Sequence, residues 1–403
     1  MALLPVAEAL QRVLAQATAL PAERVPITEA HGRVLAEDVR SLRTQPPADV
    51  SAMDGYAVRA EDVASVPISL KVTGEVAAGK PFAGTVEHGQ AVRIFTGGEV
   101  PAGADTIVVQ EQTKREGDSV IITVAPPKGR HIRTAGLDFR DGDVLLKRGR
   151  VLTGRDLGLA AAMNHPILPV YRKPRIALLA TGDELVLPGR KPGPGQIVYS
   201  NGYAVAALAR QEGAEVSDLG IARDTLPDTA AAIQDARRRK ADVLVTMGGA
   251  SVGDYDFVQQ ALAAEGMDLS FWKIAMRPGR PLMHGRLDGI HVLGLPGNPV
   301  SAFVCAFLFL TPLLRRLTGR SDVMHPVEHA LLGCDLPEND ERADYLRASL
   351  SRSPRGALVA TPFALQDSSI TRVLAEADCL VLREPHAPKA PAGSPCVILK
   401  LPL

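Results

Sequence analysis

The sequence is poor in cysteine and aromatic residues, and it carries no net charge. Its four cysteines, among 403 residues, are far apart and form no C-x-x-C pair. Neither a disulfide framework nor a structural zinc site is therefore expected, and a reducing compartment fits. The 45 basic side chains balance 45 acidic ones, so no global field would hold the chain on nucleic acid or on anionic lipid. Any anion that the protein binds must be held by a local site.

Long uninterrupted hydrophobic runs are also lacking. Residues 1–20 could be mistaken for a signal peptide, but Glu8 and Arg12 interrupt the run, and its apolar residues fall on one helical face. The most apolar stretch, Val300 to Leu314, is too short to span a bilayer and contains Pro312. It predicts a buried core helix. We expect a cytoplasmic protein with no membrane span and no nucleic-acid partner.

The pattern of residues changes along the chain in a way that predicts several domains. A single hydrophobic core would be unusually large at this length. Short β-rich runs between glycine and proline turns predict a β-rich module over residues 45–137. Residues 1–44 and 138–170 are expected to form a helical and extended N-terminal domain together. Residues 171–322 predict an α/β domain, and residues 323–403 a small C-terminal domain like a β-barrel.

The α/β domain is predicted from apolar runs that alternate with helical stretches. The runs begin at Arg175 and are interpreted as strands buried on both faces. Helices are expected over 200–212, 227–239, 255–264 and 299–317. This alternation favours an open, mostly parallel sheet, in which ligands bind beyond the carboxyl ends of the strands.

Three of these strand ends carry loops with unusual residues. The loops are Thr181-Gly182-Asp183-Glu184, the segment from Gly248 and Gly249 through Ser251 and Gly253 to Asp256, and Pro296-Gly297-Asn298. Glycines let the backbone approach a ligand, and a helix N-terminus offers free N–H groups to an anion. Neighbouring carboxylates suit a hard cation such as Mg²⁺. Any one loop could be a tight turn with solvated acids, but together they predict a phosphate-and-metal pocket.

Two further features carry weaker signals. Arg277 and Arg280 flank a Pro-Gly turn, and two guanidiniums on rigid backbone suit a tetrahedral oxyanion, although an ordinary solvated turn is the alternative. Asp54 and Asp138 lie in acidic turns beside the β-rich module, where local turn chemistry alone would explain them.

A serine hydrolase is the rival from another class of chemistry. The segment from Gly249 to Gly253 matches the G-x-S-x-G pattern and lies between a predicted strand and a predicted helix, with Ser251 as the nucleophile. No HGGG-type oxyanion segment is present in the sequence. His284 and His291 follow the serine, but both are expected to lie on strands.

Five segments resemble those of the molybdopterin molybdenumtransferases, the family of the bacterial MoeA-like enzymes and the gephyrin E domain. They are SAMDGYA at 51–57, TGGEVPAGADT at 96–106, TGDEL at 181–185, GGASVGDYD at 248–256 and LPGNPVS at 295–301. The resemblance implies an Mg²⁺-dependent transferase that takes molybdate and adenylylated molybdopterin and releases AMP. That reaction is the final step of molybdenum cofactor biosynthesis.

The resemblance also implies roles for individual residues. The catalytic acids would be Asp183, Glu184, Asp224, Asp256 and Asp54, and the cation would lie on Asp183, Glu184 and Asp256. The pterin and nucleotide would contact Thr96, Asp138, Thr181, Gly182, Gly248, Gly249, Ser251, Gly253, Pro296, Gly297 and Asn298. Molybdate would contact Arg277, Arg280, Pro281, Ser301, Arg347 and Ser368.

The family's behaviour further implies a homodimer whose site is shared between subunits. Transient contacts with the adenylyltransferase and with acceptor molybdoenzymes are expected. A molybdopterin adenylyltransferase, which performs the preceding step, is the closest alternative, because that related family resembles the α/β segment alone. The β-rich module and the C-terminal domain favour insertion over adenylylation.

Overall fold

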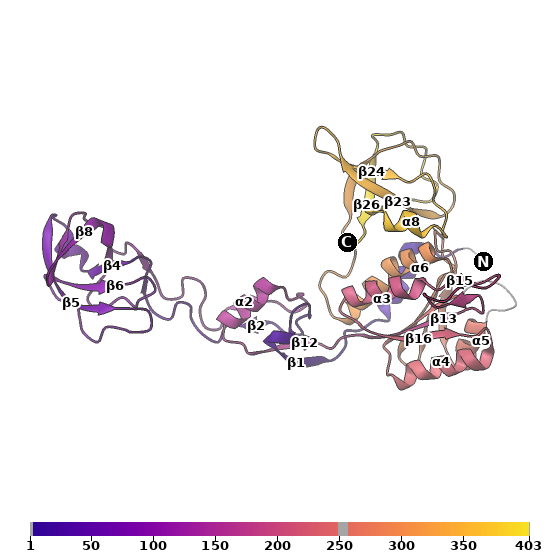
Figure 1. Ribbon diagram of the computed structural model, residues 1–403, viewed down its shortest axis with the longest axis horizontal. Coiled ribbons are helices and arrows are strands. Elements are labelled where there is room, and N and C mark those ends of the chain that lie inside the picture. Colours follow the sequence, from indigo (N-terminus) through magenta and orange to yellow (C-terminus); the bar gives the residue numbers. More distant parts are fainter. Residues whose placement is uncertain (1–2, 249–256, 403) are drawn as a thin grey trace.

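The chain is extended, with a β-rich module at one end and the α/β and C-terminal domains at the other (Figure 1). The computed structural model describes residues 3–248 and 257–402. A small connecting domain lies between the two ends. Each part has a buried apolar cluster, and the cluster of the α/β domain also takes in barrel residues such as Tyr345 and Leu380. The expected multidomain α/β and β architecture is confirmed.

The β-rich module is a six-stranded sheet in the order β7-β4-β6-β5-β9-β8. Its strands are β4 (Gly55–Val58), β5 (Ile68–Val76), β6 (Gln90–Ile94), β7 (Thr106–Val109), β8 (Thr113–Glu116) and β9 (Ser119–Ile122). Two 3-10 turns, η2 (Ala60–Val63) and η3 (Gln110–Gln112), join strands at the sheet ends. Leu70, Val108 and Ile122 are among the fully or nearly fully buried residues of its core.

The connecting domain is built from short strand pairs around one helix. β1 (Ala22–Pro26) pairs with β12 (Ile167–Tyr171), β2 (Val39–Arg40) with β11 (Val144–Leu146), and β3 (Val50–Ser51) with β10 (Ile132–Arg133). The 3-10 turn η1 (Ile27–Glu29) follows β1. Helix α2 (Gly154–Ala162) begins after Thr153, whose N–H and hydroxyl both donate to the Asp156 carboxylate, at 2.8 and 2.7 Å. These bonds fix the start of the helix.

The N-terminal helix α1 (Val6–Ala15) lies elsewhere than expected. Its buried residues Ala9 and Val13 belong to the core of the α/β domain, and the helix contacts α7. The grouping of all of residues 1–44 with 138–170 is therefore wrong for this helix. Its apolar face is covered by a partner about 300 residues away in the sequence, which local periodicity does not reveal.

The α/β domain contains a six-stranded sheet in the order β16-β13-β17-β21-β20-β18. The strands are β13 (Arg175–Thr181), β16 (Glu215–Ala222), β17 (Val243–Met247), β18 (Asp268–Trp272), β20 (Met283–Leu287) and β21 (Ile290–Leu295). The first four strands in the order are parallel to one another. β20 pairs antiparallel with β21 on one side and with β18 on the other. β13, β17 and β21 are buried throughout or nearly so, whereas β16 and β18 are half-exposed. The expectation that all these strands are buried on both faces is wrong for these two, because they form the sheet edges.

Helices cover both faces of this sheet (Figure 1). α4 (Leu226–Arg238) and α5 (Phe257–Ala264) contribute to the buried cluster on one face. On the other face lie α3 (Asn201–Gln211), α6 (Pro299–Cys305) and α7 (Thr311–Leu317), together with α1. The short pair β14 (Leu185–Val186) and β15 (Ile197–Val198) precedes α3. The four predicted helices are found, with α5 described from residue 257.

The most apolar helix is longer than expected. α6, the π-helical segment η4 (Ala306–Leu310) and α7 form one helix of 19 residues, Pro299–Leu317. By length and composition alone it could cross a membrane, so the expectation that this run is too short is wrong. However, 83% of its most apolar window is buried inside the protein, where core helices of this composition also occur. The prediction of a buried core helix is confirmed.

The C-terminal domain is a closed barrel. β23 (Ala343–Arg352) pairs with both β24 (Leu358–Pro362) and β25 (Cys379–Arg383), and the ring continues through β22 (Glu328–Leu332) and β26 (Pro395–Lys400). β19 (Met276–Arg277) of the α/β segment adds to the outside of β23. The short helix α8 (Thr371–Ala375) lies before β25 and contacts α6. This confirms the expected barrel-like domain.

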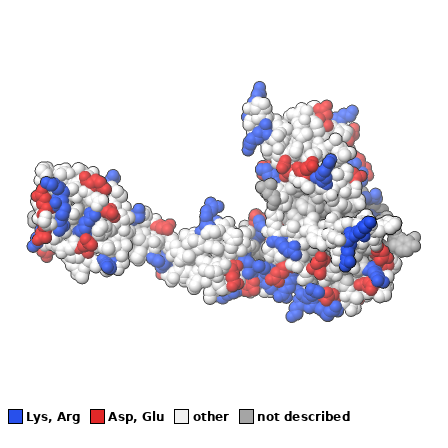
Figure 2. Space-filling model, in the orientation of Figure 1, with Lys and Arg blue, Asp and Glu red and all other residues white. Residues whose placement is uncertain are grey.

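The surface agrees with the balanced composition. Figure 2 shows acidic and basic side chains interspersed over the visible face of all the domains. All four cysteines are free thiols in this structure.

Candidate functional site

Three predicted loops meet at the carboxyl edge of the parallel sheet. In the strand register, Thr181 is opposite Ala222, and Met247 is opposite both Ala180 and Leu295. The loops that follow these strands therefore start at the same level of the sheet. This is the edge at which open α/β sheets bind ligands.

Close backbone contacts explain the glycines of these loops. Gly248 has φ 94°, and a Cβ there would lie 2.6 Å from the carbonyl oxygen of Thr181. Gly182 has φ 146°, and a Cβ there would press on the Glu184 carboxylate. The carbonyl of Gly297 accepts a hydrogen bond of 2.7 Å from the Asn201 side chain. Two loops thus require glycine, and the third is held by the first residue of α3.

The acids gather at one side of this edge. The Asp183 and Asp224 carboxylates each lie 3.4 Å from the backbone nitrogen of the other residue. Partial burial, the charge of Asp183 and the charge of Glu184 raise the pKa of Asp224. Asp256, also predicted for this group, lies outside the described residues. The structure thus brings three of the four predicted acids of the α/β domain together.

The donor set fits Mg²⁺, which proteins commonly hold through one or two carboxylates plus substrate phosphates. Asp183 and Glu184 are exposed neighbours on one turn. Within residues 3–248 and 257–402, however, no group of three or more His, Cys, Asp or Glu side chains is arranged to hold a metal ion. Any cation on these acids would therefore need ligands from the substrate, from water or from elsewhere.

Two buried hydroxyls lie beneath the loops. Thr181 Oγ1 and Thr246 Oγ1 are shielded from solvent and have no hydrogen-bond partner in the described part of the chain. A Cβ on Gly248 would lie 3.1 Å from Thr181 Oγ1. Unpaired buried polar atoms are costly, and they cluster at functional sites. Thr181 was predicted as a site residue from the family motif. Thr246 was missed, because it belongs to none of the motifs.

The predicted oxyanion residues lie where the C-terminal barrel meets the start of α6. Asn298 Nδ2 donates to Ser368 Oγ at 2.8 Å, and the Val300 N–H donates to the Ser368 carbonyl at 3.1 Å. Ser301 is buried at the start of the same helix. The structure therefore brings Asn298, Ser301 and Ser368 together.

Arg347 is the most unusual side chain of this region. It is fully buried, and its Nε and Nη1 atoms have no hydrogen-bond partner among the described residues. Nη2 donates to the carbonyl of Asp367, next to Ser368, at 3.2 Å. Burial lowers the pKa of this guanidinium, since an isolated charge is poorly solvated there, and a nearby anion would compensate.

The backbone of Arg280 is fixed by hydrogen bonds, whereas its side chain is exposed. The Arg280 carbonyl accepts hydrogen bonds from the Ile274 and Leu282 N–H groups, at 3.0 and 3.1 Å. Its exposed guanidinium has no hydrogen bond to the described residues, and Pro281 follows it. The neighbouring Gly279 packs on Cys305, which lies one helical turn after Ser301. The turn that contains Arg280 thus packs against α6, the helix that carries Ser301.

Arg277 does not fit its predicted role as a molybdate ligand in this structure. Its guanidinium makes two hydrogen bonds to the Asp344 carboxylate and further contacts to Asp340 and Asn339. These bonds raise the pKa of Arg277. The sequence-based pairing of Arg277 with Arg280 failed because Asp344 is distant in the sequence and comes beside Arg277 only through the pairing of β19 with β23.

In the β-rich module, Asp54 and Thr96 form a pair. Asp54 Oδ1 accepts hydrogen bonds from the Thr96 N–H and hydroxyl, at 2.7 and 2.8 Å. These bonds, with a smaller contribution from Arg93, lower the pKa of Asp54. Asp54 is therefore held ionised. Two predicted residues from segments 42 positions apart are in contact.

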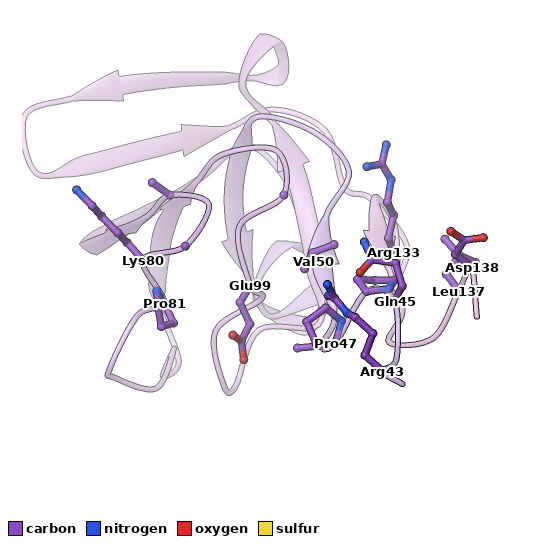
Figure 3. A pocket seen from close by; sticks show the side chains of 15 residues that line it. Arg43, Gln45, Pro47, Val50, Lys80, Pro81, Glu99, Arg133, Leu137 and Asp138 are labelled. Atoms are coloured by element: carbon purple, nitrogen blue, oxygen red, sulfur yellow. The ribbon is translucent and has the colours of Figure 1, made fainter. Parts of the chain in front are cut away.

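Asp138 lines a crevice of about 520 Å³ between the β-rich module and the connecting domain. Figure 3 shows Asp138 and Leu137 at one end of this crevice and Lys80 and Pro81 at the other. Figure 1 places the whole module far from the α/β domain of the same chain. Asp54, Thr96 and Asp138 are thus not brought to Asp183 and Glu184 within one chain.

The histidines of the hydrolase alternative are buried in the sheet. His284 and His291 lie on β20 and β21, as expected, and burial lowers their pKa values to about 4 and about 3. His291 is opposite Val243 at the start of β17, four residues before Met247. That separation corresponds to about 13 Å along a strand. Ser251, Gly249 and Gly253 lie outside the described residues.

These features define a multidomain α/β protein with acids and oxyanion donors at the carboxyl edge of its sheet. Family models match nearly all of it. The model of the MoeA N-terminal region (domain I and II) matches residues 4–164, that of a probable molybdopterin binding domain residues 177–316, and that of the MoeA C-terminal region (domain IV) residues 329–401. The chain belongs to the MoeA family.

Individual relatives agree. A molybdopterin molybdenumtransferase from Nostoc sp. is 40% identical over 336 residues, which are 81% of this chain and 77% of the relative. One from Haemophilus influenzae is 35% identical over 381 residues, 93% of each chain. The crystal structure of a molybdopterin biosynthesis MoeA protein from Pyrococcus horikosii superposes with a TM-score of 0.87 at 30% identity and covers 99% of both chains.

Proposed function

We propose that the protein is a molybdopterin molybdenumtransferase. It inserts molybdate into adenylylated molybdopterin and releases AMP, as the final step of molybdenum cofactor biosynthesis. The observation that carries the proposal is the arrangement of acids on one side of the carboxyl edge of the sheet and oxyanion donors on the other. The relatives from Nostoc sp. and Haemophilus influenzae carry this name.

The acids serve cleavage of the phosphoanhydride. Asp183 and Glu184 would hold Mg²⁺, with Asp256 as a further ligand. The cation supplies neutralisation of charge on the phosphate oxygens. Asp224 places a third carboxylate beside them. Burial, and then the charges of Asp183 and Glu184, raise its pKa, and a cation would relieve the repulsion between these charges. The glycine turns at Gly182 and Gly248 let the pterin and its phosphates approach the backbone, with the Thr181 hydroxyl beneath.

The other side of the edge binds molybdate. Arg280 and Arg347 offer unpaired guanidinium donors, and Ser301, Ser368 and the start of α6 offer further donors. A tetrahedral oxyanion suits this set because guanidiniums pair with two oxygens at once. Pro281 fixes the backbone after Arg280.

The complete site is shared between two copies of the chain. Asp54, Thr96 and Asp138 lie at the far end of the same chain (Figure 1), so a homodimer would bring the β-rich module of one subunit to the sheet edge of the other. Transient contacts with the adenylyltransferase and with acceptor molybdoenzymes would deliver the substrate and remove the product. The four free thiols support a reducing, cytoplasmic setting.

The two alternatives have less support. An adenylyltransferase would not need the β-rich module or the barrel, yet the barrel supplies Ser368 and Arg347 to the edge. A serine hydrolase would need a histidine beside Ser251, whereas His284 and His291 are buried within the sheet. Ser251→Ala should retain measurable insertion activity. Stoichiometric labelling of Ser251 in the wild-type protein by a fluorophosphonate probe would favour the hydrolase instead.

The direct test is incubation of the purified protein with adenylylated molybdopterin, Mg²⁺ and molybdate. AMP release and reconstitution of an apo-molybdoenzyme are measured together. Molybdate-dependent AMP release with reconstitution is expected. Pyrophosphate release from ATP and molybdopterin, with formation of adenylylated molybdopterin and no molybdate requirement, would indicate the adenylylation step.

A further inference from the structure

The ion pair between Arg277 and Asp344 joins the α/β domain to the C-terminal barrel. Arg277 Nε donates to Asp344 Oδ1 at 2.7 Å, and Nη2 donates to Oδ2. The Asp344 side chain is 7% exposed and that of Arg277 47%. A buried carboxylate is thus neutralised by a cation from the other domain, in a two-point geometry that fixes both planes.

The backbone around Arg277 is fastened on both sides. The Ala275 N–H donates to the Leu4 carbonyl at 2.8 Å, and the Ala343 N–H donates to the Ala275 carbonyl at 3.0 Å. Three residues after Arg277, the Arg280 carbonyl closes the turn onto Ile274. The ion pair of Arg277 is therefore added to a junction at which the backbone of the barrel is already bonded to the strand that precedes the Arg280 turn.

A second attachment of the barrel lies on the other side of the oxyanion region. Ser368 is bonded to Asn298 and Val300 at the start of α6. Gln366, two residues earlier, makes hydrogen bonds to both the N–H and the carbonyl of Arg347. The candidate anion donors are thus divided between two domains. Besides these two polar attachments and the pairing of β19 with β23, apolar barrel residues such as Tyr345 and Leu380 pack into the core of the α/β domain.

We propose that Arg277 is a positioning residue for molybdate insertion, which acts through Asp344 and does not contact the anion. Its ion pair fixes the position of the barrel relative to the α/β domain. It thereby holds Arg347 and Ser368 of the barrel at the correct distance from Arg280 and Ser301. The inference rests on the proposed function for the identity of the anion. Lysine at position 277 would keep the charge but lose the paired hydrogen bonds, so the register would be held less firmly.

The test compares Arg277→Ala, Arg277→Lys, Asp344→Asn and the double variant Arg277→Ala with Asp344→Asn. For each protein, the molybdate concentration that half-saturates AMP release and the rate at saturating molybdate are measured. Arg277→Ala and Asp344→Asn should each raise the half-saturating concentration about five- to tenfold and leave the saturating rate within about twofold, with Arg277→Lys in between. The double variant should be no worse than the single ones, because residues that act as a pair are not additive.

The matched control is Arg238→Ala, which breaks the ion pair with Asp235 on the surface of α4 and should change neither value. A direct ligand would behave differently from a positioning residue. If Arg277 bound molybdate itself, Asp344→Asn would free the guanidinium and leave the half-saturating concentration unchanged or lower. That result overturns the proposal, as does an unaltered molybdate dependence in Arg277→Ala.

Urea unfolding of the wild-type protein, Arg277→Ala, Asp344→Asn and the double variant provides a readout that does not depend on turnover. The cycle should show coupling between positions 277 and 344, with the double variant destabilised less than the sum of the single variants. Absence of coupling contradicts the ion-pair role. If the cycle shows this coupling but the wild-type protein releases no AMP, the proposed function is contradicted and the ion-pair role is supported. The two failures are therefore distinguishable.

Discussion

Asp183 and Asp224, 41 residues apart in the sequence, exchange backbone contacts, with the carboxylate of each 3.4 Å from the backbone nitrogen of the other. The contact joins the ends of two neighbouring strands, β13 and β16, and sets Asp224 beside Glu184. Three like charges at one edge repel one another unless a cation or a proton is present. A bound cation or a proton would relieve this repulsion, and the first two predictions follow from it.

The first prediction concerns Glu184. Glu184→Ala should lower the rate of AMP release by well over tenfold without unfolding the protein, because loss of a catalytic electrostatic contact commonly costs ~10²–10³ in rate. The assay is AMP release at saturating Mg²⁺ and molybdate. Asp268→Ala, which removes an exposed acid from the edge strand β18, is the control and should be silent. Unchanged turnover in Glu184→Ala would remove this acid from the mechanism.

The second prediction concerns pH and Asp224. Because burial and neighbouring charges raise the pKa of Asp224, its carboxyl is protonated at a higher pH than an ordinary aspartate. A cation favours the ionised form, so the Mg²⁺ concentration needed for half-maximal AMP release should rise as the pH is lowered towards the raised pKa of Asp224. Asp224→Asn should show a flatter dependence on pH. A wild-type requirement that is independent of pH would contradict this.

The third prediction concerns Arg280. Arg280→Ala should raise the half-saturating molybdate concentration roughly ten- to a hundredfold, since a charge-assisted hydrogen bond contributes about 1.5–3 kcal/mol. The Mg²⁺ requirement should change much less, and Arg280→Lys should recover part of the loss. Arg355→Ala, at an exposed turn of the barrel, serves as control. If the molybdate dependence of Arg280→Ala is unaltered, the oxyanion binds elsewhere.

The fourth prediction concerns the shared site. Asp54→Ala and Glu184→Ala should each be nearly inactive, but a co-refolded mixture should regain up to about one quarter of the wild-type activity. Half of the randomly formed dimers are mixed, and each mixed dimer has one site with both halves intact. A mixture of Asp183→Ala with Glu184→Ala, both defective in the same half, should stay inactive. No recovery in the first mixture would place the whole site within one chain.

The residues that the sequence predicted well are those whose neighbours follow from strand topology. Once β13, β17 and β21 are parallel, the loops after Thr181, Met247 and Leu295 must meet at one edge. Asp54 and Thr96 were implied separately by two family motifs, and the structure shows the hydrogen bonds between them. Sequence patterns at strand ends and turns predict positions well, because the local backbone and the strand order determine where these residues lie.

The residues that the sequence did not predict have partners set by tertiary packing. Arg277 lies in a turn that looks solvated, and only the pairing of β19 with β23 brings Asp344 to it. Helix α1 shows which of its faces is apolar but not which domain covers that face. Thr246 and Asn201 belong to an ordinary strand and an ordinary helix start. The burial of the Thr246 hydroxyl and the bond from Asn201 to Gly297, 96 residues later, depend on tertiary packing.

The closed ring of the C-terminal barrel has a consequence for how the chain can be shortened. β26, Pro395–Lys400, pairs with β22 on one side and β25 on the other. A chain truncated before residue 395 would therefore expose two unpaired strand edges at once, and such edges recruit strands from other molecules. β26 is therefore required to close the barrel, so an affinity tag can follow this strand but cannot replace it.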